Sequence, residues 1–320
     1  MSPLTLGSLF SGYGGLDLGI RAAFGDVQPL WHSEINSNAA TVLHHHWPDI
    51  PNLGDITQIK WRKVPPVDIL AGGFPCQDLS TAGKRRGFDD GTRSALWTYY
   101  AKAIKKLRPR LVVIENVKGL LNASAHLRAL GDIHPDMATD RPPTAIEAVL
   151  ADLAELGYHA RWLCLEASEA GAPHRRARVF IAATPADSYR EFHVRPVPNP
   201  VAGAQAPLPG GGEESALDAL ERHGIGPGRW PGRFRSALER WEKVIGRPAP
   251  YPVDHDGERD RLSLDMIEWM MGLPRGHVTA VPDLSRTAQI ALLGNGVVPQ
   301  QAHLALAELC DDEAWIGSDA

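Results

Sequence analysis

The sequence predicts an α/β fold with a mostly parallel sheet, followed by a second, smaller and less regular domain. Short apolar runs typical of buried strands alternate with helically spaced stretches as far as residue 183, and strand–helix–strand units build parallel sheets. From residue 185 to about residue 252 the chain is rich in Pro, Gly and Arg, and its periodicity is weak. We expect residues 1–184 and 286–320 to form one domain and residues 185–285 to form the other.

Apolar runs and helical spacing position the elements along the chain. Pro109 ends one expected helix, because proline disfavours the helical conformation of the residue before it. Gly157 ends another, because glycine readily adopts the left-handed conformation that terminates a helix. The expected strands are residues 4–10, 27–33, 67–71, 111–114, 158–165 and 179–183, and the expected helices are residues 16–24, 39–47, 96–107 and 146–156. Farther on, residues 237–245 and 262–271 have helical spacing, and residues 291–307 resemble a turn followed by a helix.

Composition restricts the class of protein. The 320 residues carry a formal net charge of -5, so binding of a polyanion requires a local basic surface. The three cysteines lie far apart without a CxxC pair, which fits a reducing compartment and excludes a cysteine zinc site. No apolar run approaches the roughly 18 residues of a membrane span, and the N-terminus lacks the pattern of a signal peptide. We therefore expect a soluble cytoplasmic protein.

Five chemically distinctive residues fall at or just beyond the ends of predicted strands. They are Phe10, Glu34, Asp55, Cys76 and Glu115. Parallel sheets bind ligands outside the carboxyl ends of their strands, so we expect these side chains to meet at one rim. By contrast, the consecutive histidines 44–46 would face different directions on a helix without a ligand set, and we expect them to lie in solvent.

The loop GGFPCQDLS, residues 72–80, places Cys76 just past a predicted strand. A buried cysteine is usually an inert small hydrophobe. Here Gly72 and Gly73 allow unusual dihedral angles and close approach by a ligand, while Pro75 fixes its own φ. This is the composition of a shaped loop rather than of a core, and it makes Cys76 a candidate nucleophile.

Two further stretches suit an adenosine-type cofactor. FSGYGG, residues 10–15, is a glycine loop between a strand and a helix, which allows a nucleotide-like ligand to approach the backbone. It is not GxGxxG, so a pyrophosphate is not implied. Glu34 suits ribose hydroxyls, and Asp55 suits an adenine amino group.

Basic residues gather in two places. HRRAR, residues 174–178, runs directly into a predicted core strand, so we expect some of its guanidinium groups to face the rim. Between residues 222 and 247, seven basic side chains oppose two glutamates, a local excess of five positive charges. Trp230, Phe234 and Trp241 lie among them, a mixture suited to nucleic acid and also to ordinary packing of a small domain.

Taken in order, these stretches resemble the cytosine carbon-5 DNA methyltransferases. The resemblance rests on FSGYGG, Glu34, GDIT, GGFPCQ, ENV, RRAR, EWMMGLP and GNGVVPQQA, and it covers most of the chain outside residues 185–255. The spacing of GGFPCQ and ENV is its most specific part. One departure is His174, where the family usually has glutamine, and another is Ala82, where some relatives carry a hydroxyl.

The resemblance implies a Rossmann-like, S-adenosylmethionine-dependent domain with a smaller target-recognition domain inserted late in the chain. It assigns catalysis to Cys76, Glu115, Arg176 and Arg178. It assigns the cofactor to the glycine loop, to two strand ends and to the last motif: Phe10, Gly12, Gly14, Gly15, Glu34, Ile35, Asp55, Ile56, Pro75, Leu96, Asn295 and Val297. The expected DNA contacts are Lys84, Arg85 and Arg86 in a closing loop, and Arg229, Arg233 and Arg235 in the recognition region.

The implied reaction is methyl transfer to a cytosine flipped out of duplex DNA, by a monomer, with the link to a cognate restriction endonuclease left open. Three alternatives remain. RNA methylation would be accompanied by a much smaller recognition region, a non-catalytic DNA-binding regulator would not require Cys76, and a cysteine hydrolase would place a histidine beside the thiol. The sequence does not reveal the DNA target.

Overall fold

A computed structural model describes residues 3–75, 96–123, 144–186, 192, 194–197, 235–255 and 260–310. Its centre is a six-stranded sheet of order β2-β1-β3-β4-β6-β5. The strands are β1 (Leu4–Leu9), β2 (Val27–Ser33), β3 (Ile69–Gly72), β4 (Leu111–Val117), β5 (Tyr158–Glu166) and β6 (Ala177–Pro185). The expected α/β class is confirmed.

The sheet is parallel from β2 to β4 and antiparallel at β6. β5 and β6 form an antiparallel pair joined by residues 167–176, without a helix between them. A connection this short turns the chain back on itself, whereas a parallel neighbour would need a long crossover. Five of the six strands therefore run in the same direction, as expected of a mostly parallel sheet, and β6 is the exception.

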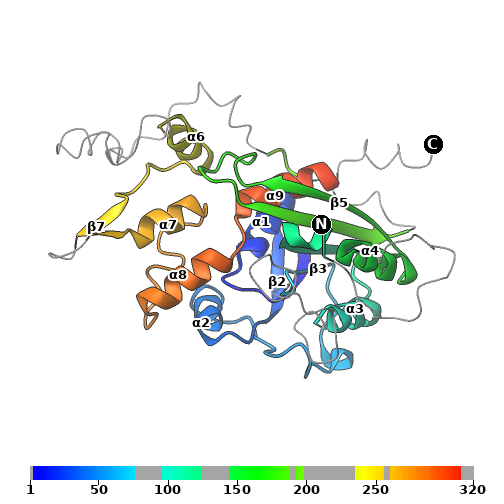
Figure 1. Ribbon diagram of the computed structural model, residues 1–320. Coiled ribbons are helices and arrows are strands. Elements are labelled where there is room, and N and C mark those ends of the chain that lie inside the picture. Colours follow the sequence, from blue (N-terminus) through cyan, green and yellow to red (C-terminus); the bar gives the residue numbers. More distant parts are fainter. Residues whose placement is uncertain are drawn as a thin grey trace.

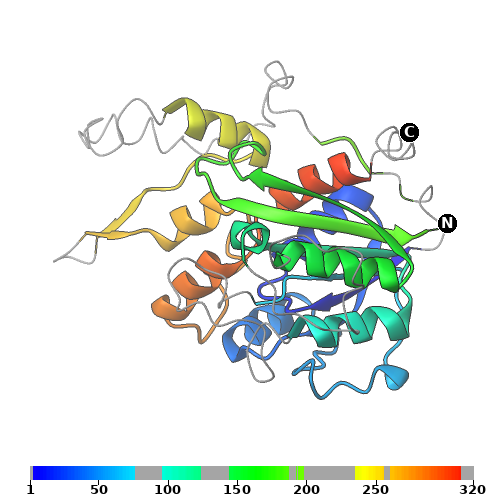
Figure 2. The same cartoon turned by 45° about the vertical axis from the view of Figure 1, so that its right-hand side comes forward.

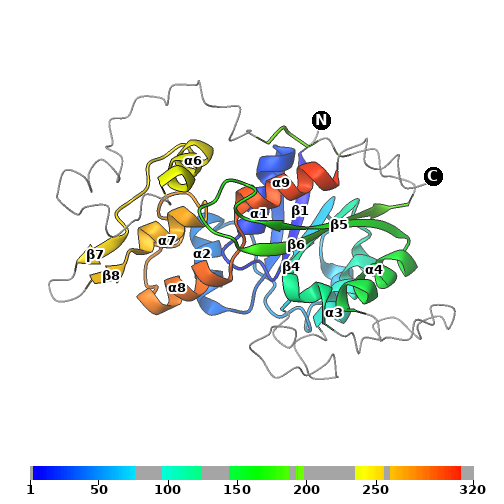
Figure 3. The same cartoon turned by 45° about the horizontal axis from the view of Figure 1, so that its top comes forward.

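Helices cover both faces of the sheet (Figures 1 and 3). One face packs against α1 (Gly15–Phe24) and α9 (Pro299–Leu309), and the other against α3 (Leu96–Leu107) and α4 (Ala145–Glu155). Side chains alternate between the two cores as the pleat requires: Leu70 faces one, while Ile69 and Ala71 face the other. The result is a three-layer arrangement closed by a helix from the end of the described chain.

A second lobe extends from one end of the sheet (Figure 2). It contains α2 (Ser37–His46), α6 (Arg235–Ile245), β7 (Val253–His255), β8 (Asp260–Leu262), α7 (Leu264–Met270) and α8 (Arg286–Asn295). A third buried cluster joins the four helices of this lobe, and in it Trp241 donates its indole N–H to the Trp269 carbonyl at 2.8 Å. Tyr13 of the glycine loop belongs to the same cluster, so the lobe packs directly on that loop.

Some element ends differ from expectation. α2 begins at Ser37, two residues early, because the Asn36 side chain caps it by accepting the N–H of Ala39. β4 continues through Glu115 to Val117, because it pairs along its length with β6, so Glu115 lies inside a strand and not beyond it. Asp55 follows no strand and lies in a loop.

Two short 3-10 helices, Trp61–Lys63 and Lys118–Leu121, complete the described elements. Among the described helices, none combines the length and the apolar character that crossing a membrane would require.

Candidate active site

The loop between β1 and α1 has an unusual backbone. Phe10, Gly12 and Gly14 have φ values of 52°, 56° and 82°, which is an uncommon conformation for phenylalanine. Gly12 donates its N–H to Glu34 Oε2 at 2.8 Å, which connects the loop to the end of β2. A residue such as Phe10 keeps this conformation only where the surrounding structure holds it in place, and such residues are concentrated at ligand-binding sites.

The second half of this loop lies against the chain between α8 and α9. A Cβ on Gly15 would lie 2.3 Å from the Val297 carbonyl oxygen, so only glycine permits this approach. The buried Tyr13 hydroxyl donates to the same oxygen at 2.8 Å. Burial raises the pKa of Tyr13 well above its ordinary value, so the phenol stays a donor. Residues nearly 300 positions apart thus share one contact.

The end of β2 presents a carboxylate and an exposed apolar side chain. Glu34 Oε1 accepts the Asn36 N–H at 2.7 Å while Oε2 accepts that of Gly12, so both carboxylate oxygens are fixed in direction. Ile35 is 73% exposed, the highest value among the large exposed hydrophobic residues of the described chain. An apolar surface beside an oriented acceptor suits a flat heterocycle that carries hydroxyl groups.

The loop that carries Asp55 is attached to the same strand end. Ser33 Oγ donates to the Gly54 carbonyl at 2.7 Å, immediately before Asp55. Ile56, the next residue, is buried and anchors the loop in the core. The loop that carries Asp55 is therefore attached to the end of β2, although no strand leads to Asp55.

A buried ion pair lies on the inner strands. Arg178 Nε on β6 lies 2.8 Å from Glu115 Oε1 on β4, with side-chain exposures of 14% and 11%. Burial raises the pKa of Glu115, and the charges of Arg178 and Arg176 oppose that change without cancelling it. The carboxyl group therefore holds a proton to higher pH than an exposed glutamate does.

Glu115 also lies against the residues that precede Cys76. A Cβ on Gly73 would come within 2.8 Å of Glu115 Oε2, so the absence of a side chain there lets the carboxyl group approach the loop backbone. The neighbouring Asn116 donates its Nδ2–H to the Phe74 carbonyl at 3.0 Å. Cys76 itself lies outside the described residues, but the chain enters it from this position.

Arg176 does not face the same way as Arg178. Its Nη1 and Nη2 groups donate to the carbonyls of Gly294 and Gly296, each at 2.7 Å. Its Nε is buried without a hydrogen-bond partner. Arg176 thus holds the segment around Asn295, the last residue of α8, and its predicted part in catalysis stays a prediction.

The remaining predicted residues divide into two groups. Pro75 and Leu96 are the described residues on either side of residues 76–95. The chain segments that carry them are in contact, since the ring centroids of Phe74 and Trp97 are 5.4 Å apart. Arg235 is the exposed first residue of α6. The predicted residues outside the described chain are Cys76, Lys84, Arg85, Arg86, Arg229 and Arg233.

Sequence reasoning missed several residues that hold the site together. Tyr13 lies in FSGYGG, where an aromatic residue among glycines indicates that the loop packs against other parts of the chain. Asn116 lies in ENV. His174 contacts the Met270 carbonyl at 3.1 Å, which fits a part in supporting loop structure. Glu268, the first residue of EWMMGLP, accepts the N–H groups of Gly276, Val278 and Thr279, which the motif by itself does not predict.

The expectation for histidines 44–46 needs a correction. His44 and His45 are exposed, but His46 is half-buried and stacks on His277, with ring centroids 4.1 Å apart and an interplanar angle of 6°. The ring is covered because the loop after α7 packs on α2. Within the described residues, no group of three or more His, Cys, Asp or Glu side chains could hold a metal ion.

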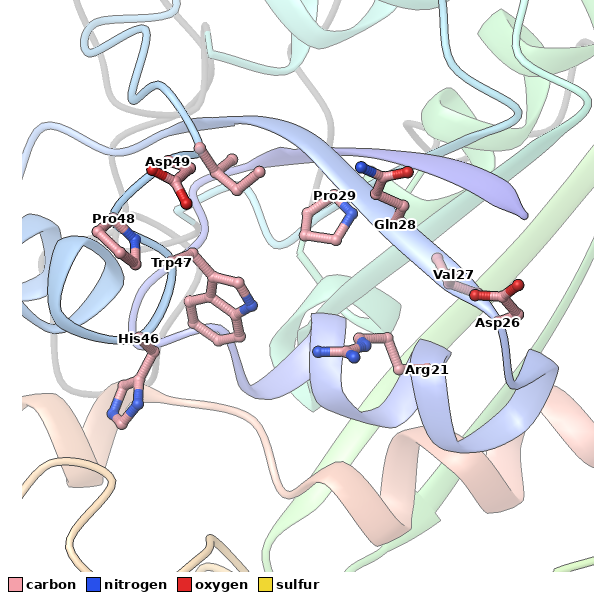
Figure 4. Close-up of a pocket in the computed structure, with 10 residues that line it drawn as sticks. Arg21, Asp26, Val27, Gln28, Pro29, His46, Trp47, Pro48 and Asp49 are labelled. Atoms are coloured by element: carbon pink, nitrogen blue, oxygen red, sulfur yellow. The ribbon is translucent and has the colours of Figure 1, made fainter. Parts of the chain in front are cut away.

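A pocket of about 390 Å³ lies away from this rim, beside β2 (Figure 4). Its lining comes from the end of α1, the first half of β2 and the segment after α2, and includes Arg21, Pro29 and Trp47. None of the predicted site residues lines it. The candidate active site is therefore defined by its side-chain contacts and not by this cavity.

Comparison with known sequences agrees with this geometry. The family model of the C-5 cytosine-specific DNA methylases matches residues 4–206. The chain is 36% identical over 177 residues to the type II methyltransferase M.NgoBV of Neisseria gonorrhoeae, which covers 54% of this chain and 39% of that protein. It is 32% identical over 231 residues to the type II methyltransferase M1.ScrFI of Lactococcus lactis subsp. cremoris, which covers 72% of this chain and 53% of that protein. The chain thus spans about half of these relatives' length or less.

Solved structures share the fold. A DNMT2 mutant of Spodoptera frugiperda superposes with a TM-score of 0.60 at 16% identity, covering 96% of this chain and all of that one. The methyltransferase EhMeth of Entamoeba histolytica superposes with a TM-score of 0.61 at 14% identity, covering 98% of this chain and 99% of that one. At these identities the likeness concerns the fold alone. Because the family model matches more than half of its length, the chain belongs to the C-5 cytosine-specific DNA methylases.

Proposed function

We propose that this protein transfers a methyl group from S-adenosylmethionine to carbon 5 of a cytosine in duplex DNA, through a covalent adduct with Cys76. The observation that carries the proposal is the buried Glu115–Arg178 pair, whose carboxyl group lies against Gly73, three residues before Cys76. A carboxyl group with a raised pKa, a fixed positive charge and a thiol are the groups that addition to the cytosine ring requires.

The residues at the rim fit the methyl donor of this family, S-adenosylmethionine. The oriented carboxylate of Glu34 suits the ribose hydroxyls, the exposed Ile35 suits a face of the adenine ring, and Asp55 suits its amino group. Phe10 and the glycines after it allow the donor to lie close to the backbone. When bound, the donor supplies an electrophilic methyl group.

Cys76 starts the proposed chemistry. Carbon 5 of cytosine is too weakly nucleophilic to accept a methyl group, so the thiolate first adds to carbon 6 and converts the ring to an enamine. Arg178 supports the thiolate with positive charge. Glu115 donates its proton to ring nitrogen 3 as the sulfur–carbon bond forms, a role that its raised pKa favours. After methyl transfer, a water molecule takes the carbon 5 proton, the carbon 6–sulfur bond breaks to release the thiolate, and nitrogen 3 returns its proton to Glu115.

The DNA is held by basic residues on two parts of the chain. A cytosine within stacked duplex cannot reach Cys76, so the base must be flipped out. We assign contacts with the DNA backbone to Lys84, Arg85 and Arg86, and target recognition to residues 185–285, including Arg229, Arg233 and Arg235. The protein acts as a cytoplasmic monomer in this proposal, either alone or beside a restriction endonuclease.

The first test replaces the nucleophile. Cys76→Ser should lower methyl transfer to duplex DNA by roughly 10⁴-fold or more, because a serine hydroxyl is not ionised at neutral pH. Binding of S-adenosylmethionine, measured by calorimetry, should be unchanged. Cys164→Ser, a half-buried cysteine on β5, is the matched control and should retain activity.

The same assay separates the alternatives. Labelled methyl groups should appear in duplex DNA and not in transfer RNA, and bisulfite sequencing of DNA from expressing cells should reveal one target sequence. DNA containing fluorocytosine should become covalently attached to the wild-type protein. Transfer to RNA alone, or turnover retained by Cys76→Ser, would contradict the proposal.

A further inference from the structure

Three buried polar side chains meet beneath the glycine loop. Ser8 on β1, Asp17 on α1 and His32 on β2 are each at most 2% exposed. Ser8 Oγ donates to Asp17 Oδ1 at 2.8 Å, and His32 Nε2 lies 3.4 Å from Asp17 Oδ2. Neither Oδ2 nor Nε2 has another hydrogen-bond partner. A buried carboxylate is costly unless it is fully paired, so this arrangement needs a reason.

The cluster connects the elements that carry the cofactor residues. Ser8 lies two residues before Phe10, and His32 lies two residues before Glu34, on neighbouring parallel strands that pair at these two positions. Asp17 occupies the first turn of α1, directly after the glycine loop. The Asp17 carboxylate therefore links the ends of β1 and β2 to the helix that the loop enters.

Other contacts transmit the cluster's position to the loop. The Ser8 carbonyl accepts the Ser11 hydroxyl at 3.1 Å. The His32 ring packs edge to face on Trp47, with centroids 5.6 Å apart, and Trp47 in turn lies so near Gly14 that a Cβ there would come within 2.7 Å of it. A shift of Asp17 or His32 would thus reach the loop backbone through packed atoms.

We infer that Asp17 and His32 are positioning residues for S-adenosylmethionine, holding the ends of β1 and β2 so that Phe10 and Glu34 stand at the separation the methyl donor needs. The inference rests on the proposed function. The separation of 3.4 Å suits an ion pair but is long for a hydrogen bond.

The test measures cofactor binding apart from catalysis. Asp17→Ala should raise the Kd for S-adenosylmethionine by about tenfold in calorimetry, and in the methylation assay its KM should rise far more than kcat falls. His32→Leu should behave like Asp17→Ala, whereas His32→Gln, which retains an N–H donor, should recover much of the affinity.

Asp68 offers a matched control. Its Oδ2 accepts the N–H and hydroxyl of Thr5 at 2.8 and 2.7 Å, so this carboxylate also braces β1, but at the opposite end of the sheet. Asp68→Ala should lower the free energy of unfolding without changing the Kd. Circular dichroism and chemical unfolding of every variant separate lost binding from lost folding.

The outcomes are distinct. If wild-type protein fails to bind S-adenosylmethionine, the proposed function is wrong. If wild type binds and Asp17→Ala, folded, binds equally well, only the positioning inference is overturned. The positioning inference alone is also overturned if Asp68→Ala weakens S-adenosylmethionine binding as much as Asp17→Ala does. It is likewise overturned if His32→Gln binds S-adenosylmethionine no better than His32→Leu. Should Asp17→Ala not fold, the two His32 variants decide the question alone.

Discussion

Glu115 shows how far a single residue can be interpreted from sequence. Four apolar residues before it indicated a buried carboxylate, and burial is what raises its pKa. The pattern could not show that the side chain of Glu115 faces Arg178, because β4 and β6 pair through residues 61 to 71 positions apart in the chain. The same limit applies to Arg176, whose neighbours in sequence gave no sign that it binds the carbonyls of Gly294 and Gly296.

Replacing Glu115 should change both activity and the pH dependence of stability. Glu115→Gln should reduce kcat by about 10²-fold or more, because the amide cannot donate a transferable proton to the ring. The pKa of Glu115 is raised in the native state, so its favourable contribution to stability is complete below the pKa of the unfolded chain and is lost as the pH rises through the native pKa.

Chemical unfolding across pH tests this sign. The stability of Glu115→Gln relative to wild type should improve as the pH rises from 4 to 7, by about 1.4 kcal/mol for each unit of pKa shift. Glu239→Gln, an exposed position on α6, should show no such trend. A pH-independent difference for Glu115→Gln would argue against the raised pKa.

At the scale of elements, local signals were sufficient where an element buries one face regularly. Helical spacing located α3, α4 and α6, and apolar runs located every strand of the main sheet. The errors arose where distant contacts decide. β4 is longer than its apolar run because β6 pairs with it, and β6 is antiparallel because a short turn replaces a crossover helix.

The contact between α1 and α9 gives a prediction at this scale. A Cβ on Gly19 would lie 2.6 Å from the Ala302 Cβ and 2.8 Å from the Pro299 carbonyl oxygen, so the two helices are in contact at their backbones. Gly19→Ala should destabilise the protein by about 1–3 kcal/mol through overpacking, measured by urea unfolding.

A second glycine-to-alanine change provides the comparison. A Cβ on Gly294, within α8, would meet nothing within 4 Å. Gly294→Ala should therefore stabilise the protein by roughly 0.5–1 kcal/mol, the ordinary gain in a helix. Equal effects of the two substitutions would show that helix propensity, and not packing against α9, determines the outcome at Gly19.

At the scale of the molecule, His277 joins the second lobe to the glycine loop after β1. Its Nε2 contacts the Tyr13 carbonyl at 2.8 Å, and its ring stacks on His46. Burial lowers the pKa of His277 to about 4, and the nearby His46 and His45 act in the same direction. The neutral ring is thus part of the junction between the lobes.

Acid should weaken this junction. A lowered pKa means that the stability contributed by His277 is present above the ordinary pKa of 6.5 and is lost as the pH falls toward 4, by roughly 3 kcal/mol in all. The unfolding free energy of wild type should fall over this window, and that of His277→Gln should fall less. Parallel pH profiles for the two proteins would contradict this role.

The order in which the glycine loop is assembled has a consequence for synthesis of the protein. The Val297 carbonyl that Gly15 and Tyr13 contact is made 284 residues after Tyr13. Chains emerge from the ribosome N-terminus first. The glycine loop therefore lacks one wall until Val297 has been made.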